Sequence, residues 1–307
     1  MNILSPLKIT AAMIASGTSI AEPAVGETAW VSAGTYVLGD QRIRATTHRI
    51  YECVQAHSSR TALPEVDGSY WLNKSPTQRF APFDIYTSTA AIGITSISYV
   101  LTLGYFNAMA LYGLTGTNVE ITIKDEPGGN TIYSYVQGLS EDPPGWYEFL
   151  FSPLKLITKK ILKELPIRPN AELIVTVTAG AGNAVGIGMI NVGDYRSLVS
   201  DGSWGGTEYG ASAEPVSYSY TKVDADGTTK IIRRTSATGM RATVMLPREQ
   251  ADAALSLIQD VLDLPVSWVA TDASGYAGLN VFGLGSASVG YDGPGHATLN
   301  INVKGLI

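Results

Sequence analysis

Turn-forming residues divide this sequence into short stretches, and this feature rules out long helices as its main element. The chain has 32 Gly and 15 Pro among 307 residues, and only 16% of its residues are charged. Val, Ile, Thr and Tyr, which favour strands, fill the stretches between the turns. We therefore expect a mainly β protein with many short strands joined by tight turns.

The turn signals also indicate four segments. An N-terminal arm covers residues 1–25, and a small aromatic-rich β domain covers 26–80. Residues 81–198 are expected to form a jelly-roll-like β-sandwich, because turn signals divide them into about seven or eight short strands. One of these expected strands is Trp146–Phe151. A link rich in Gly and Ser leads to an α+β domain at 207–307.

One helix is expected, in the last segment, where it would cover one face of a sheet and leave the other face open to a partner. Pro247 suits its first position, and Pro265 lies beyond its end. The residues of its apolar face would be Ala251, Ala254, Leu255, Ile258 and Leu262.

The charge pattern argues against nucleic acid as a partner and against insertion into a membrane. The net charge is −6, and the one basic cluster, between residues 155 and 163, lies beside Glu164. Residues 85–119 carry no formal charge, but Thr, Ser and Gly recur among them, and residues 92–100 alternate with period two. Strands in a sandwich or at a subunit interface explain this run better than a transmembrane helix does.

A single cysteine, Cys53, makes an intrachain disulfide impossible, which suits folding in a reducing cytoplasm. Its place in an expected strand favours a buried structural thiol over a reactive one. The apolar stretch Ile9–Ile14 is too short for a signal peptide, and we interpret it as a short helix capped by Thr10.

No constellation typical of catalysis or metal binding stands out, so we expect a protein that is not an enzyme and that uses no metal or cofactor. The three histidines, which lack metal-ligand spacing and are interpreted as solvated turn residues, are His48, His57 and His296. A polysaccharide hydrolase stays open as an alternative. The carboxylates that could serve it, near Trp146, are Glu141, Asp142 and Glu148.

Residues 29–40 resemble the start of a chitin-binding-type carbohydrate module. That family has Trp, a short gap, Tyr, Gly-Asp, a strand ending near a second Tyr, and a closing Pro and Trp. The matching residues here are Trp30, Tyr36, Gly39-Asp40, Tyr51, Pro64 and Tyr70-Trp71. The resemblance implies a sugar-binding surface in which aromatic rings stack on sugar rings.

The residues that would form this surface are Trp30, Tyr36, Tyr51, Tyr70 and Trp71. The alternative is that the same rings form the core of a domain too small to bury layers of aliphatic side chains. In that case the module would keep its fold without binding sugar and would serve as a docking element.

The wider sequence is similar to a family of tailed-bacteriophage virion proteins that carry such a module near the N-terminus. The shared elements are Arg79–Asp84, Asn107–Leu114, Trp146–Phe151 and Leu246-Pro247. The resemblance implies a structural protein of the tail tip or baseplate, made in the cytoplasm of the bacterial host and located in the virion. It would assemble with copies of itself and with other tail proteins, and an outer module would face fibres or host-surface glycan. The alternative is a glycan-binding receptor protein that serves adsorption.

Overall fold

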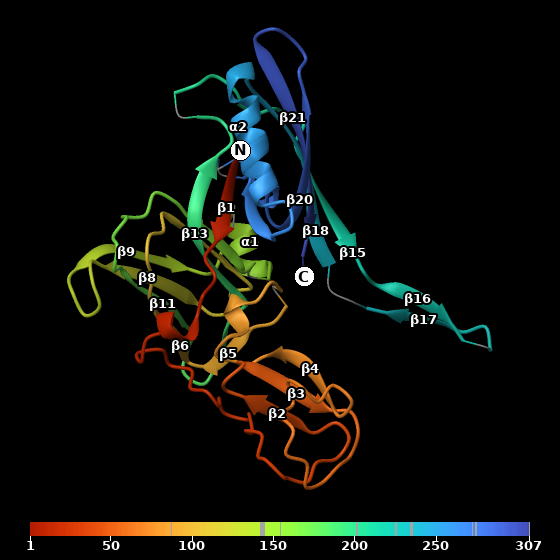
Figure 1. Ribbon diagram of the computed structural model, residues 1–307. Coiled ribbons are helices and arrows are strands. Elements are labelled where there is room, and N and C mark those ends of the chain that lie inside the picture. The colour runs from red at the N-terminus through yellow and green to blue at the C-terminus, as the bar shows by residue number, and fades with distance from the viewer. Residues whose placement is uncertain are drawn as a thin grey trace. The chain divides into compact units, whose positions relative to one another are not determined.

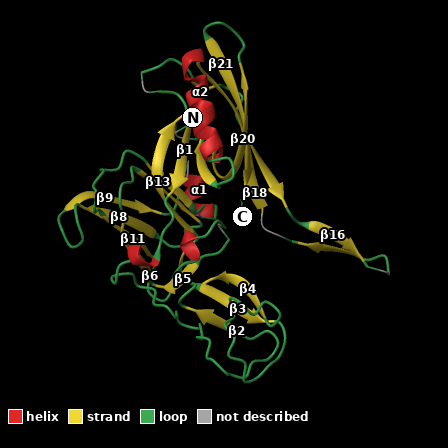
Figure 2. Ribbon diagram, viewed as in Figure 1, coloured by secondary structure: helices red, strands yellow, loops and turns green. Residues whose placement is uncertain are grey.

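The computed structural model has 46% of its residues in strands and 9% in helices, which confirms the expected mainly β fold (Figures 1 and 2). The residues that it describes are 1–86, 88–141, 145–153, 155–200, 202–224, 226–233, 236–271, 273 and 275–306. Within these residues, no helix is both long and apolar enough to cross a lipid bilayer. The charge-free run at 85–119 forms strands, as expected.

The chain forms two compact units, each built from segments that are distant in sequence. The first, here called the helix-covered unit, comprises Met1–Leu7, Phe106–Met109 and Val192–Ile307. The second, here called the sandwich unit, comprises Lys8–Tyr105 and Ala110–Asn191. The strands that contribute residues to both are β7 (Ala108–Tyr112) and β13 (Met189–Ser197).

The helix-covered unit is built on one antiparallel sheet, in which the strands run in the order β13-β1-β19-β20-β21-β18 and both β14 and β15 pair with β18. A separate ribbon consists of β16 and β17. The elements are β1 (Asn2–Pro6), β14 (Gly206–Thr207), β15 (Ser212–Ser217), β16 (Tyr220–Val223), β17 (Thr229–Ile232), β18 (Ser236–Pro247), η3 (Arg248–Gln250), α2 (Ala251–Asp260), β19 (Val266–Val269), η4 (Ala277–Leu279), β20 (Asn280–Gly290) and β21 (His296–Gly305).

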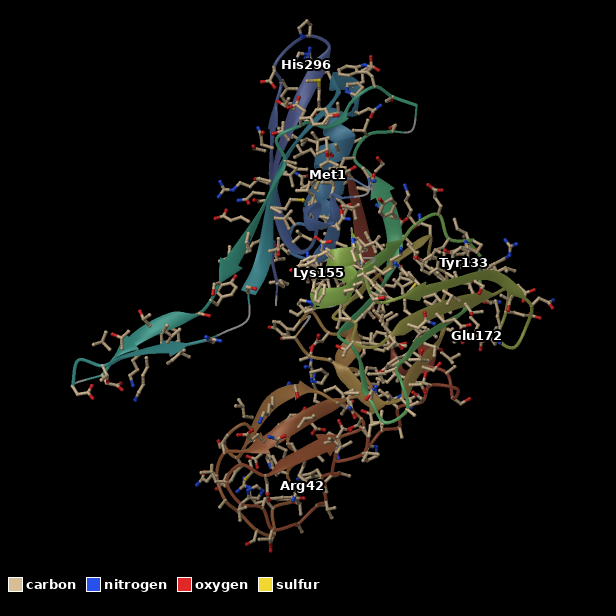
Figure 3. All side chains as sticks on the ribbon, turned by 180° about the vertical axis from the view of Figure 1, so that it is seen from behind. Met1, Arg42, Tyr133, Lys155, Glu172 and His296 are labelled. Atoms are coloured by element: carbon tan, nitrogen blue, oxygen red, sulfur yellow. The ribbon has the colours of Figure 1, made fainter. Side chains whose placement is uncertain are left out.

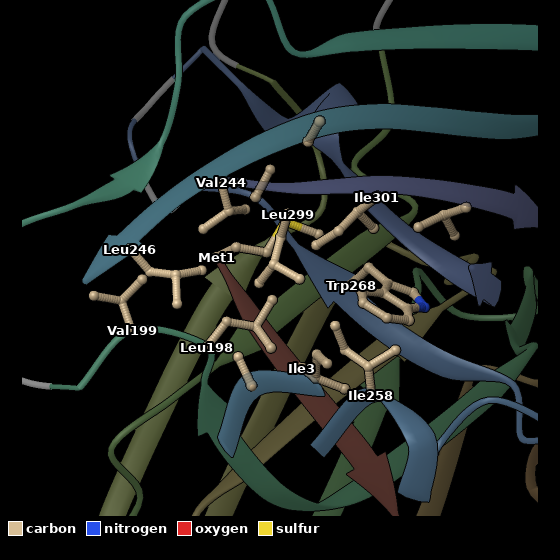
Figure 4. Packing of buried hydrophobic residues seen from close by; sticks show 14 of the residues in the cluster. Met1, Ile3, Leu198, Val199, Val244, Leu246, Ile258, Trp268, Leu299 and Ile301 are labelled. Atoms are coloured by element: carbon tan, nitrogen blue, oxygen red, sulfur yellow. The ribbon is translucent and has the colours of Figure 1, made fainter. Parts of the chain in front are cut away.

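Period-two patterning places the core of this unit on one face of the sheet. Along β21, Leu299, Ile301 and Val303 are buried, whereas the residues between them are exposed. The buried face packs against α2 and the indole of Trp268 (Figure 4). Burial of these apolar side chains is the main favourable contribution to the stability of the unit.

The helix expected in the last segment is confirmed, with a later start. Pro247 ends β18, a 3-10 turn follows, and α2 begins at Ala251. Ala254 and Ile258 face the core as expected, but Leu262 lies beyond the helix and is exposed.

Residues of the expected N-terminal arm form β1, which lies between β13 and β19 in the sheet. Ile3 pairs with Arg196 on one side and Trp268 on the other, and the side chains of Ile3 and Leu4 are buried. Further along, a 3-10 turn, η1 (Ala11–Met13), stands where a short helix was expected. Thr10 occupies its N-cap position, but its side chain makes no capping hydrogen bond.

The sandwich unit contains a four-stranded antiparallel sheet with the order β6-β11-β8-β9, a two-stranded pair β12-β5 and a three-stranded sheet β2-β3-β4. Alternating buried residues, such as Ile121 and Ile123 on β8, form its core. The elements are η1, β2 (Gln41–Arg44), β3 (Arg49–Cys53), β4 (Trp71–Pro76), η2 (Ala81–Phe83), β5 (Ala91–Ile94), β6 (Ser96–Thr102), β8 (Asn118–Lys124), β9 (Thr131–Gly138), α1 (Trp146–Phe151), β10 (Lys159–Leu162), β11 (Glu172–Thr178) and β12 (Ala184–Ile187).

The strand expected at Trp146–Phe151 is wrong, because this segment is the helix α1. Gly145 caps it, and the amide of Phe149 donates to the carbonyl oxygen of Gly145 at 3.0 Å. The amide of Ser152 donates to Glu148 in the same way, also at 3.0 Å. The segment has apolar residues on nearly every side and no alternation, so its sequence did not specify a sheet face.

Candidate functional site

The five aromatic residues that the sequence singled out lie together in the small sheet β2-β3-β4 and the loops around it. Tyr36, Tyr51 and Trp71 are buried and, with Cys53, form a separate hydrophobic cluster. Trp30 and Tyr70 are half-buried and pack against that cluster. The structure therefore brings the predicted residues together, with three of the five rings in the interior of the module.

Tyr36 is fixed from several directions. Its hydroxyl donates to the carbonyl oxygen of Val31 at 2.7 Å and accepts from the amide of Val31 at 2.8 Å. Its ring meets the edge of the Trp71 ring, with centroids 4.9 Å apart. A Cβ atom at Gly34 would lie 2.9 Å from Cζ of Tyr36, so the close passage of the loop over this ring requires glycine.

The two half-buried rings are each covered by an arginine. The Arg44 guanidinium lies 5.2 Å from the ring centroid of Trp30, and that of Arg60 lies 3.8 Å from the ring centroid of Tyr70. Such cation–π contacts are worth about 0.5–1 kcal/mol at exposed positions. A ring face that already carries a guanidinium is not open for stacking on a sugar.

Each of these arginines is held in place by a carboxylate. Nε and Nη2 of Arg44 donate to both oxygens of Glu65, at 3.2 and 3.1 Å. Nε of Arg60 donates to Asp67 at 3.0 Å. A third arginine, Arg42 on β2, labelled in Figure 3, lies 5.2 Å from the ring centroid of Tyr36. The exterior of the module is thus lined by arginines above its aromatic rings.

His57 is a member of this site that sequence reasoning assigned to a solvated turn, and that interpretation is wrong. Its half-buried imidazole lies within 5.4 Å, centroid to centroid, of the rings of Tyr36 and Trp71. Its Nδ1 lies 2.9 Å from the carbonyl oxygen of Gln55 and 3.7 Å from Sγ of Cys53. The sequence did hold a signal for this contact, because His57 follows Cys53 by four positions at the end of a strand.

The Cys53–His57 pair is arranged as a structural contact and not as a nucleophile with its base. Sγ of Cys53 donates to the carbonyl oxygen of Gln55 at 3.1 Å, and burial raises the pKa of the thiol. Since the thiolate is the reactive form, a raised pKa works against nucleophilic chemistry. The buried structural thiol expected from the sequence fits this environment.

His48 also departs from the expected solvated turn residue. It lies in a turn with φ of 54°, but its imidazole stacks on Phe80 with centroids 3.8 Å apart. Its Nδ1 is 2.8 Å from Oε2 of Glu22, and the other carboxylate oxygen of Glu22, Oε1, accepts from the hydroxyl of Thr77 at 2.6 Å. These contacts attach the small sheet to the chain on either side of it.

The residues considered for hydrolysis or metal binding form no cluster within the described part of the chain. Asp142 lies outside the described residues. Glu141 is exposed, whereas Glu148 is half-buried in the first turn of α1. Among the residues that the structure describes, no group of three or more His, Cys, Asp or Glu side chains is placed to hold a metal ion.

A run of exposed apolar residues lies on α1, and none of its six residues is buried. Trp146 is 80% exposed, Phe149 70% and Phe151 71%. We call the following residues the α1 surface: Trp146, Tyr147, Phe149, Leu150 and Phe151. Contiguous exposed apolar residues of this kind mark interaction sites in soluble proteins.

No protein-family model, no curated protein and no solved structure matches this chain.

The two candidate sites differ in what they can do. In the small module, the aromatic residues are engaged with one another and with arginines, an arrangement that stabilises a domain with little aliphatic core. The α1 surface is free to pack against a partner. Sugar binding by Trp30, Tyr36, Tyr51, Tyr70 and Trp71 stays a prediction, in which Trp30 and Tyr70 are the more accessible rings.

Proposed function

We propose that this chain is a structural component of a bacteriophage tail tip or baseplate, where it assembles with copies of itself and with other tail proteins. In this proposal the protein is located in the virion, supports fibres or contact with the host surface, and performs no chemistry. The similarity of Arg79–Asp84 and Asn107–Leu114 to tailed-phage virion proteins supports it, and so does the mainly β fold.

The observation that carries the proposal is the α1 surface. Each Å² of apolar area removed from water contributes about 25 cal/mol, so five large exposed side chains represent a substantial driving force for association. A helix of six residues is also too short to be stable without tertiary contacts. A neighbouring subunit would supply both the cover and the contacts.

The alternative of a glycan-binding adsorption protein has less support from the small module. Tyr36, Tyr51 and Trp71 present no open ring face, and Arg44 and Arg60 lie over the two rings that remain accessible. Binding of a sugar there would first require these two arginines to leave their carboxylate partners.

The test is the double substitution Phe149→Ser with Phe151→Ser, examined in the isolated chain and in assembled particles. Because both side chains are exposed, we expect the free energy of unfolding to change by less than about 0.5 kcal/mol. In particles produced with this variant as the only source of the chain, we expect its incorporation, measured by mass spectrometry of purified tails, to fall at least tenfold.

The matched control is Tyr105→Ser, which removes an exposed aromatic ring elsewhere in the sandwich unit. This variant should be incorporated normally. Normal incorporation of the double variant would show that the α1 surface is not needed for assembly and would contradict the proposal.

A further inference from the structure

A groove lies on the face of the β18-β21-β20 sheet that points away from α2 and the core. Its volume is about 530 Å³, within the range of about 300–1,000 Å³ typical of ligand sites. The lining residues used below are Arg241, Thr243, Ser286, Ser288, Asn300 and Asn302. The groove lies wholly within the helix-covered unit.

Strand register arranges these side chains in two rows across the sheet. Asn302 pairs with Arg241 on β18 and with Ser286 on β20. Asn300 pairs with Thr243 and with Ser288 in the same way. Since alternate residues of each strand point into the core, both rows face the groove.

Hydrogen-bonding groups of these rows are free to meet a ligand. The Thr243 hydroxyl donates to Oδ1 of Asn300 at 3.1 Å, which leaves the NH₂ group of that amide available. In the part of the chain that the structure describes, the Ser288 hydroxyl and the side-chain amide of Asn302 have no hydrogen-bond partner, whereas the main chain of Asn302 is paired in the sheet. The rows thus offer both donors and acceptors, spaced by the strands.

The groove is close to neutral. Among the described residues that line it, only Arg241 is charged, and its guanidinium lies 3.7 Å from the carboxylate of Glu214. Hydroxyls and amides in this arrangement match an uncharged, polyhydroxylated ligand. They offer little to an anion or to an apolar molecule.

A second hollow, of about 230 Å³, continues the groove, because Arg241 and Asn302 line both. Its lining holds the Arg241–Glu214 pair and one further charged residue, Lys304, and Tyr218, which is 39% exposed, adds an aromatic ring. Aromatic rings stack on the apolar faces of sugars, while polar neighbours orient the hydroxyls. The continuation makes the site elongated, as a chain of sugar units requires.

We propose that this groove binds a segment of an uncharged glycan, with Asn302, Ser288 and Asn300 contacting hydroxyl groups and Tyr218 contacting one sugar face. The site is distinct from the aromatic cluster of the small module. It does not depend on where the protein is located or on the α1 surface, so it can stand or fail separately from the proposed function.

The test is saturation-transfer NMR and calorimetry on the full chain with defined hexasaccharides. The neutral probes are β-1,4-glucose, α-1,4-glucose and N-acetylglucosamine hexamers, and a hexamer of galacturonic acid is the anionic probe. We expect at least one neutral hexamer to bind and the anionic one to bind more weakly. Asn302→Ala should weaken the neutral interaction about tenfold, as expected for the loss of about one hydrogen bond.

A bulky substitution separates this site from others. Ser288→Trp should abolish binding by filling the groove, whereas Ser256→Trp, on the exposed face of α2, should leave it unchanged. Tyr218→Ala should weaken binding, and Tyr276→Ala, an exposed tyrosine of the same unit outside the groove, should not. Circular dichroism of each variant checks that the sheet is intact.

Several outcomes would overturn the proposal. One is that no neutral hexamer binds, and another is that the galacturonic acid hexamer binds as tightly as the neutral ones. Binding that persists in Ser288→Trp but is lost in Trp30→Ala would move the sugar site to the small module. Protection of the groove from hydrogen exchange only in an assembly, without any sugar binding, would assign this face to a protein neighbour.

Discussion

At the scale of single residues, a close packing contact joins Gly285 on β20 and Trp268. The Trp268 side chain is fully buried, and its Nε1 donates to the carbonyl oxygen of Gly283 at 3.2 Å. A Cβ atom at Gly285 would collide with the indole ring. The fold therefore needs glycine here for space and not for an unusual backbone conformation.

We predict that Gly285→Ala lowers the free energy of unfolding by about 1–3 kcal/mol, because it overpacks the core. Denaturant unfolding of the full chain measures this change. The control is Gly295→Ala, in the same unit, where a Cβ atom would meet nothing within 4 Å. Equal stabilities for the two variants would contradict the packing described for Trp268.

Cys53 provides a second prediction at this scale. Burial raises the pKa of its thiol above the ordinary value, so the neutral thiol is the favoured form in the folded chain. The stability that this contributes is present at neutral pH and declines as the pH rises from the ordinary thiol pKa through the raised one. We expect iodoacetamide to alkylate Cys53 at least about tenfold more slowly in the folded than in the denatured chain at pH 7.5. Similar rates in both states would place the thiol at the surface.

At the scale of elements, the ribbon β16–β17 is the least supported part of the helix-covered unit. It forms a two-stranded sheet of its own, and Val223 and Ile231 are exposed. A two-stranded ribbon without a covering layer is only marginally stable in water. In an assembly, its free edges would pair with or pack against a neighbour.

Hydrogen exchange of the isolated chain measures this difference. We expect amides of β16–β17 to exchange close to the rate of an unstructured chain, and those of β18 and β21 to be protected by several orders of magnitude. The protection of the ribbon should rise when the chain is part of a particle. A ribbon as protected as β21 in the isolated chain would show that it needs no partner.

Sequence patterns predicted those elements whose burial is decided locally. In α2, Ala251, Ala254 and Ile258 recur at helical spacing, and in β21 apolar and polar residues alternate. Each pattern therefore predicts which side of the element is buried. In α1, none of the apolar residues is buried by the residues that the structure describes, and the aromatic content suggested a strand in place of a helix. The sequence of β1 is too short to reveal that Ile3 lies between Arg196 and Trp268.

The candidate site was predictable only in part, for a related reason. The spacing of aromatic residues in 29–71 predicted which rings lie together, because the strands and loops that carry them are neighbours in the sequence. Which ring faces stay open depends on Arg44 and Arg60, and on carboxylates that lie 21 and 7 positions away. The groove above Asn300 and Asn302 depends on pairing between strands, which no short motif shows.

At the scale of the whole molecule, a mainly β chain carries exposed elements that a partner could cover. The α1 surface belongs to the sandwich unit, and the ribbon belongs to the helix-covered unit. Each unit thus has at least one element that its own core does not cover. A chain of this kind gains stability from mass action when neighbours bind the folded state.

The most direct test of the proposed place in the phage tail is a cryo-electron microscopy map of an intact particle of a phage whose genome encodes this chain. We expect repeated copies of the two units at the host-facing end of the tail, with Trp146, Phe149 and Phe151 buried against a neighbouring subunit. Purified particles that lack the chain, or a map in which all three side chains face solvent in every copy, would contradict it.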